Sequence, residues 1–181
     1  MLTDRIFAVF SFRQGVYAEV EKDTSFTTTA WILVVVASFL NQLGLFASSN
    51  LIGWLIGTVG GTIFAVLGFT VGVLVVNWVG RILFHADVSF DELVRTLGLA
   101  YTWQALGVVG IVAAFSDALC GELYLVMVTS VAMLIVAWIV AAREALDLGW
   151  LQTAITVALG WLAQFTITIV AAGLVLGLLK G

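Results

Sequence analysis

From Leu51 to Gly80 the chain reads LIGWLIGTVGGTIFAVLGFTVGVLVVNWVG, without a single charged residue. A helix rises about 1.5 Å per residue, so about 20 apolar residues cross a hydrocarbon core about 30 Å thick. The stretch therefore predicts a membrane-spanning helix. It is too long for one crossing and too short for two. We expect Leu51–Ile56 to form an interfacial or tilted lead-in and Gly57–Phe84 to cross.

The remaining charge-free stretches divide into four more segments of spanning length. Of the 181 residues, 62% are hydrophobic and only 10% are charged, and the mean hydropathy is +1.18. A soluble domain carries about a quarter charged residues and could not bury so much apolar surface. The sequence thus predicts an all-α integral membrane helical bundle of about five transmembrane helices. The four further spans are expected at Thr27–Phe46, Leu97–Phe115, Leu123–Ala142 and Ala154–Leu179.

Residues 1–26 are expected to form a cytoplasmic amphipathic segment ahead of a transmembrane domain at 27–181. Apolar residues recur at roughly helical spacing from Leu2 to Val20, while Asp4, Arg13 and Glu19 lie off that stripe. This pattern favours an interfacial helix that lies on the membrane surface. A frayed tail is the alternative.

The basic residues predict the orientation, because loops rich in Lys and Arg stay in the cytoplasm. With a cytoplasmic N-terminus, only Lys180 of the seven Lys and Arg residues lies outside. The expected location is the cytoplasmic (inner) membrane, with several passes and Cys120 in an external loop. The six residues placed inside are Arg5, Arg13, Lys22, Arg81, Arg95 and Arg143.

Four amide side chains interrupt the predicted spans, namely Asn41, Asn77, Gln104 and Gln164. All are neutral, whereas ion-coupled transporters typically place charged side chains at mid-membrane depth. The amides are interpreted as hydrogen-bonding contacts between helices. Alternatively, they converge on one cavity and form a polar ligand site.

Small residues recur every three or four positions in the second span, and the fifth span repeats the pattern. Such spacing lets two helix backbones approach closely, although glycine is also simply common in membrane helices. The helix-packing residues predicted from it are Gly57, Gly61, Ala65, Gly68, Gly72, Gly173 and Gly177.

The sequence offers little for catalysis or for a cofactor. Ser89 and Glu92 have the spacing of a capping box, which predicts a helix start in a cytoplasmic elbow between the second and third spans. His85, the only histidine, is an interface residue or, alternatively, an axial ligand of a chlorophyll-type pigment. No further Cys or His cluster supports a metal site. We predict no enzyme activity and no cofactor, and a bound lipid or pigment stays open.

Two runs of the sequence resemble the bacterial branch of the Yip domain family, polytopic proteins named after Rab/Ypt-interacting proteins of eukaryotes. The first run is VSFDELVRTLGLA at Val88–Ala100, and the second is AWIVAAREALD at Ala137–Asp147. The segment Val16–Thr27 also matches the family's lead-in. The resemblance implies five spans, a cytoplasmic N-terminus and no enzyme activity. Eukaryotic relatives act in vesicle trafficking through GTPases and partner membrane proteins.

One departure concerns the third span. Family members usually carry a proline shortly after the Gly-x-Ala of this span, where this chain has Tyr101-Thr102-Trp103, and the chain contains no proline. A straighter third helix is therefore expected.

The function expected from these observations is that of a non-catalytic scaffold or accessory subunit. It would associate with other integral membrane proteins and with lipids, and a larger energy-transducing complex is one setting for it. The alternative is a channel or transporter for a neutral or lipid-like solute. A net charge of −4 and the lack of any Lys/Arg run argue against nucleic-acid binding.

Overall fold

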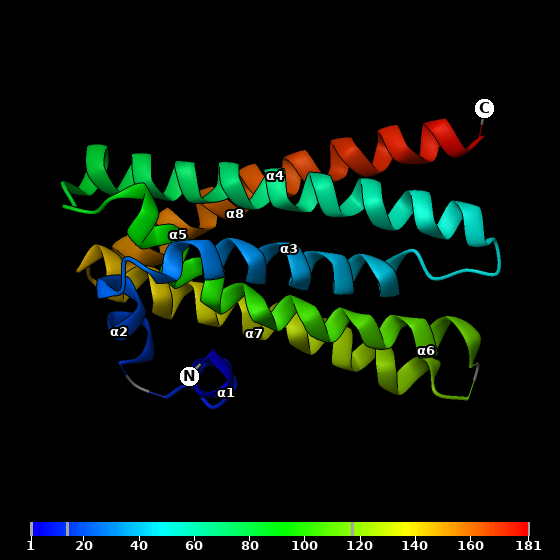
Figure 1. Ribbon diagram of the computed structural model, residues 1–181. Helices are drawn as coiled ribbons and strands as arrows, with labels where there is room; N and C mark the ends of the chain where they lie inside the picture. The colour runs from blue at the N-terminus through cyan, green and yellow to red at the C-terminus, as the bar shows by residue number, and fades with distance from the viewer. Residues whose placement is uncertain (1, 14, 117, 181) are drawn as a thin grey trace.

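The computed structural model describes residues 2–13, 15–116 and 118–180, and it describes side chains of the last helix up to Val170. Within these ranges the chain is helical and has no strand. Figure 1 shows the helices in order. They are α1 (Leu2–Phe10), α2 (Val16–Lys22), α3 (Phe26–Leu45), α4 (Leu51–Phe84), α5 (Phe90–Ala100), the 3₁₀-helix η1 (Tyr101–Val109), α6 (Gly110–Phe115), α7 (Cys120–Leu146) and α8 (Trp150–Lys180).

Five helical segments among the described residues are long and apolar enough to cross a membrane. Four of them are single helices, and the third is built from α5, η1 and α6. They run side by side in Figure 1. The predicted fold class is confirmed, and the chain is a multi-pass membrane protein. The segments are Phe26–Leu45, Leu51–Phe84, Phe90–Phe115, Cys120–Leu146 and Trp150–Val170.

Helix α4 is continuous over 34 residues, so the expected lead-in is simply its first turns. The Asn50 side chain accepts a hydrogen bond from the Gly53 backbone N–H at 3.2 Å and caps the helix start. At the other end His85 adopts a left-handed conformation, with φ of 57°, and Ala86 N donates to Gly80 O at 3.0 Å. The helix is about 51 Å long. It therefore exceeds the thickness of a hydrocarbon core.

The third span is not a uniform α-helix, although it lacks proline. From Tyr101 to Val109 it winds as a 3₁₀-helix, which has three residues per turn and rarely extends so far. This segment crosses α3 at Gly44 and Gly107. A Cβ atom on either glycine would overlap an atom of the other helix. The change in winding thus coincides with a very close backbone approach.

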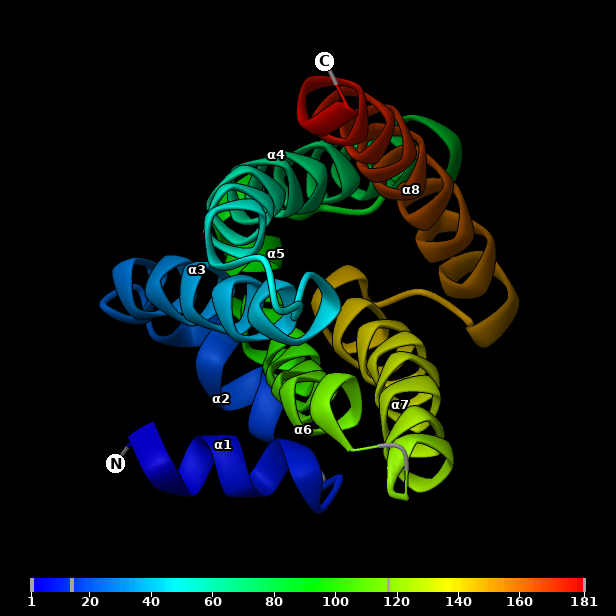
Figure 2. The same ribbon diagram turned by 90° about the vertical axis from the view of Figure 1, so that its right-hand side faces the viewer.

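The N-terminal segment forms two helices where the sequence predicted one. Gly15, with φ of 78°, separates α1 from α2. The apolar stripe of α2 faces the bundle, because Val16 and Val20 are fully buried, whereas Phe7 of α1 is 73% exposed. Figure 2 shows α1 as the outermost helix, beside α2.

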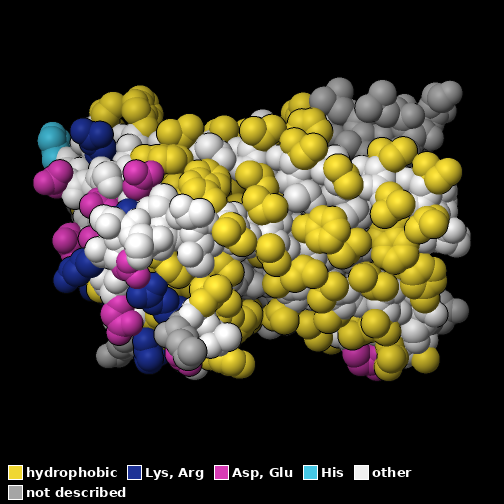
Figure 3. All heavy atoms as spheres, in the orientation of Figure 1, with side chains coloured by type: hydrophobic (Ala, Val, Ile, Leu, Met, Phe, Trp, Pro, Cys, Tyr) yellow, Lys and Arg dark blue, Asp and Glu magenta, His cyan; other side chains and the backbone are white. Residues whose placement is uncertain are grey.

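Charged side chains gather at one end of the molecule. Figure 3 shows Lys, Arg, Asp and Glu clustered at the end that holds α2, while the flank of the bundle is mostly hydrophobic. This asymmetry is what the positive-inside pattern requires. The core between the helices is aromatic, with Phe69 in edge contact with both Tyr101 and Trp138.

Candidate functional site

The charged end of the bundle is organised around Arg95, a residue of α5 that is only 5% exposed. Its Nε and Nη2 atoms donate to the backbone oxygen of Glu21, at 3.0 and 2.5 Å, and its Nη1 donates to the Thr27 hydroxyl at 3.2 Å. Glu21 lies in the last turn of α2, where carbonyl oxygens lack partners within the helix. A buried guanidinium therefore satisfies the C-terminal end of α2.

Glu144 of α7 binds the opposite end of α2. Its carboxylate accepts a hydrogen bond from the Ala18 backbone N–H at 2.9 Å, where a negative charge is favoured by the helix dipole. A helix of 7 residues is not stable on its own. Arg95 and Glu144 thus hold α2 by both ends, and we call this arrangement the α2 clamp.

Two side chains of α2, Tyr17 and Glu21, have raised pKa values. Burial raises the pKa of the Tyr17 hydroxyl, and the Glu144 carboxylate adds to the effect. Burial also raises the pKa of Glu21, and the charges of Glu92 and Asp147 act in the same direction, against the opposing effect of nearby cations. Several carboxylates therefore lie near one another at this end. They do not form a metal site, because the described residues contain no group of three or more His, Cys, Asp or Glu that could hold a metal ion.

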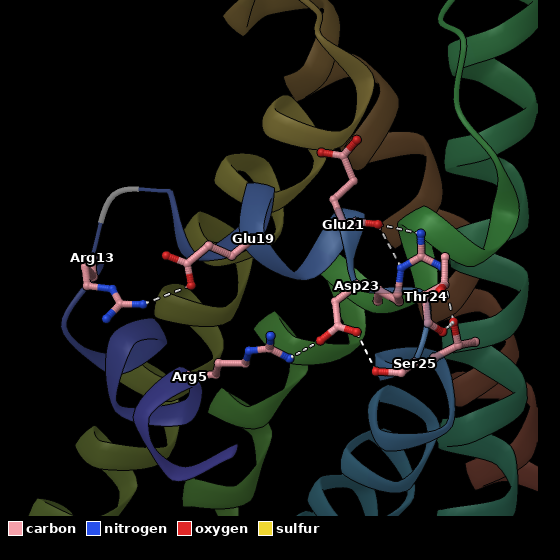
Figure 4. A network of polar contacts seen from close by, with 9 residues as sticks. Arg5, Arg13, Glu19, Glu21, Asp23, Thr24 and Ser25 are labelled. Atoms are coloured by element: carbon pink, nitrogen blue, oxygen red, sulfur yellow. Dashed lines mark hydrogen bonds and ion pairs between the residues drawn. The ribbon is translucent and has the colours of Figure 1, made fainter. Parts of the chain in front are cut away.

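Helix α1 is tied to the segment that follows α2. Figure 4 shows Arg5 beside Asp23, with N–O distance 2.8 Å, and Ser25 donating to the same carboxylate at 2.5 Å. These hydrogen bonds, first that of Ser25 and then that of Arg5, lower the pKa of Asp23. The exposed Arg13–Glu19 pair at 3.3 Å contributes little, because exposed pairs are screened by solvent.

The elbow between α4 and α5 contains the predicted capping box. Glu92 N donates to the Ser89 hydroxyl at 3.2 Å, and Ser89 N donates to the Glu92 carboxylate at 2.7 Å. Asn77 belongs to this elbow as well, because its amide donates to Val88 O at 3.3 Å. His85 is the exposed residue that ends α4.

The other three predicted amides, Asn41, Gln104 and Gln164, line one cavity of about 230 Å³ between α3, α4, η1, α7 and α8. Gln164 Nε2 donates to the Tyr101 hydroxyl at 3.3 Å. The Gln164 Oε1 atom and the Trp161 indole N–H are buried and have no hydrogen-bond partner among the described residues. The Ser38 hydroxyl of the same lining is likewise buried without a described partner, so three polar atoms of the lining residues are unsatisfied.

A second, apolar hollow of about 360 Å³ lies between α7 and α8. Ile135 and Ile139 line it from α7, and Ala158 and Leu162 from α8. Its lining shares Trp161 with the polar cavity. The polar cavity and the hydrocarbon-lined hollow thus meet at Trp161 and Phe165.

The predicted small residues of α4 face two different neighbours. A Cβ on Gly57 or Gly61 would meet the Phe46 ring at 2.6 and 2.8 Å, whereas on Gly68 and Gly72 it would meet Gln164 of α8. Ala65 lies between the two groups and lines the polar cavity.

In α8, a Cβ on Gly173 would meet no described atom within 4 Å, so the described part of the chain makes no close approach there. Gly177 lies outside the residues whose surroundings the structure describes.

Sequence reasoning missed the tightest contacts. Gly160 meets Gly72 O, and Gly44 meets Gly107 and Gly110, all through backbone atoms. The Gly107-x-x-Gly110 spacing was a usable signal, whereas Gly160 stands alone in its helix segment. It also missed the partners of Arg95 and Glu144, although both residues stand in the runs that carry the family resemblance.

Comparison with known proteins supports the resemblance. The family model of the Yip1 domain matches residues 7–172. Searches of curated proteins and of solved structures find no match to the chain. The matched region includes the α2 clamp, the elbow and the residues that line the polar cavity. This multi-pass membrane protein therefore belongs to the Yip1 domain family.

Proposed function

We propose that this chain is a non-catalytic scaffold or accessory subunit of the bacterial branch of the family. It binds other integral membrane proteins at the charged end of its bundle, and lipids along its flanks. This end lies in the cytoplasm, and the protein resides in the inner membrane. A larger energy-transducing complex is one setting in which such a subunit serves.

The observation that carries the proposal is the α2 clamp. Arg95 and Glu144 are engaged with backbone atoms of α2, and Arg5 with Asp23. These charged residues therefore stabilise the positions of α1 and α2 and are not arranged around a reacting group. The resulting end presents α1, α2 and the elbow as one preformed surface, and a preformed surface lowers the entropic cost of binding a partner.

The experiment compares variants of the full chain extracted in mild detergent. Arg95→Met removes charged hydrogen bonds worth about 1.5–3 kcal/mol each and should release α2. Glu144→Gln keeps the side-chain shape and removes only the charge at the helix N-terminus. Native electrophoresis of the wild type should give species larger than the monomer, and both variants should lose them.

Arg81→Met is the matched control, because Arg81 is an exposed cation at the same end of the molecule and belongs to α4. It should keep the larger species. Thermal unfolding of each variant separates loss of a partner from loss of the fold. A wild-type protein that migrates only as a monomer in several mild detergents would contradict the proposal.

A second candidate is a channel or transporter for a neutral or lipid-like solute. It is favoured by the convergence of Asn41, Gln104 and Gln164 on one cavity. It is weakened by Asn77, which hydrogen-bonds within the elbow. Flux of an uncharged solute such as glycerol into proteoliposomes, compared with empty liposomes, tests it.

A further inference from the structure

The polar cavity lies deep within the membrane-spanning part of the bundle. Gln164 follows the start of α8 at Trp150 by about four turns, or about 21 Å of helix. Helix α8 begins at Trp150, directly after the charged turn that contains Asp147. The cavity is therefore surrounded by hydrocarbon at a depth that the phosphate of a phospholipid does not reach.

The lining of the cavity defines the chemistry that fits. None of its lining residues is charged, and the polar ones are amides and hydroxyls. Among the described residues, Ser38 Oγ, Gln164 Oε1 and Trp161 Nε1 are buried without a hydrogen-bond partner, and the side chains that carry them line the cavity. A buried polar atom without a partner is destabilising. An occupant that both accepts and donates a hydrogen bond suits a lining of amides and hydroxyls, which offers both donors and acceptors.

The neighbouring hollow indicates what is attached to that group. It is lined by aliphatic and aromatic side chains of α7 and α8. Phe165 and Trp161 line both it and the polar cavity. A ligand with a small uncharged head and a hydrocarbon tail can occupy both spaces at once, whereas water can occupy only the polar one.

We propose that the cavity binds the hydroxyl head of an uncharged lipid alcohol, whose tail lies in the hollow between α7 and α8. A hydroxyl both donates to and accepts from the amide and hydroxyl groups that line the cavity. A quinone can only accept, and a phospholipid head carries charge into a site that has no countercharge. Such a site is independent of partner binding at the charged end of the bundle.

The test uses purified full-length protein in phosphatidylcholine nanodiscs and two photoactivatable probes with identical diazirine tails. One probe is a diacylglycerol, with a free hydroxyl, and the other is a phosphatidylcholine. Mass spectrometry maps the adducts. We expect the diacylglycerol to label the facing sides of α7 and α8 at least about fivefold more than phosphatidylcholine, as one net hydrogen bond requires. The hydroxyl could belong to a diacylglycerol or to an isoprenoid alcohol. Competition by dioctanoylglycerol or by a long-chain isoprenoid alcohol distinguishes these two lipid classes.

Two variants and one control complete the design. Gln164→Leu removes one amide from the lining, and Val131→Phe narrows the cavity at a residue already 38% exposed. Both should reduce diacylglycerol labelling to the phosphatidylcholine level. Val128→Phe adds the same side chain to α7 at a residue that does not line the cavity and should leave labelling unchanged.

If Gln164→Leu fails to fold, the diacylglycerol labelling of the Val131→Phe variant tests the proposal by itself. Equal labelling by both probes, or labelling that Val131→Phe leaves unchanged, would show only water in the cavity and ordinary lipid around the bundle. Labelling of this site by a quinone photoprobe and not by diacylglycerol would also overturn the assignment of a hydroxyl.

Discussion

Replacing Gly160 with alanine should destabilise the bundle, because α4 and α8 touch there through their backbones. A Cβ atom at this position would lie 2.6 Å from Val76 Cγ2 and 2.9 Å from Gly72 O. The valine can change its rotamer, but the carbonyl oxygen is fixed by its helix. The two helices must therefore separate by a few tenths of an ångström along their contact.

The expected magnitude follows from two opposing effects. Overpacking of a close contact costs about 1–3 kcal/mol, while alanine gains up to about 1 kcal/mol over glycine in helix propensity. The net destabilisation is therefore about 1–2 kcal/mol. Gly173→Ala is the matched control in the same helix, because its Cβ would meet no atom of the described residues within 4 Å. It should be neutral or slightly stabilising.

Gly61→Ala provides an intermediate case. Its Cβ would meet the ends of the Gln42 and Phe46 side chains, at 2.7 and 2.8 Å, and these can move aside. Reversible unfolding in mixed micelles, followed by tryptophan fluorescence, should rank the free energies of unfolding as Gly173→Ala above Gly61→Ala above Gly160→Ala. Equal effects at Gly160 and Gly173 would refute the close-contact reasoning.

Three further outcomes are expected. A membrane-impermeant maleimide should label Cys120, which is exposed, on intact cells; labelling only after permeabilisation would reverse the orientation. Ser89→Ala should cost about 1 kcal/mol of unfolding free energy, the usual value of an N-cap, and no loss would mean that Glu92 compensates. Because the pKa of Asp23 lies below its ordinary 3.8, its pairing with Arg5 is present above that pH and is lost as the pH falls through the lowered value. Pepsin should cleave the α1 region faster at a pH below the lowered pKa of Asp23 than at a pH above its ordinary 3.8, and Asp23→Asn should remove that difference.

The membrane spans were predictable because the signal is local. Each span contains a long run without charge, and a run of about 20 apolar residues is long enough to cross the hydrocarbon core as a helix. The capping box at Ser89 was equally readable, since donor and acceptor are three residues apart. The continuity of α4 was less predictable, because an apolar run longer than the bilayer thickness is compatible with one long helix or with a broken one.

The α2 clamp and the cavity could not be derived from the sequence. Ala18 and Glu144 are 126 positions apart, and nothing in either neighbourhood identifies the other as its partner. The stripe of the N-terminal segment likewise predicted a membrane-facing helix, because an apolar face gives no sign of whether lipid or protein covers it. Three of the four amides do line one cavity, but Asn77 shows that polarity within a span does not by itself reveal what a side chain contacts.

Site-specific photo-crosslinking in intact membranes tests the central claim, that partner proteins assemble at the charged end. A benzophenone side chain is placed at Asp87, an exposed residue of the elbow turn, or at Tyr124, which is 64% exposed near the start of α7 at the opposite end. The account predicts protein adducts from position 87 in several-fold excess over those from position 124. Equal yields, an excess from position 124, or no protein adduct from either position would contradict it.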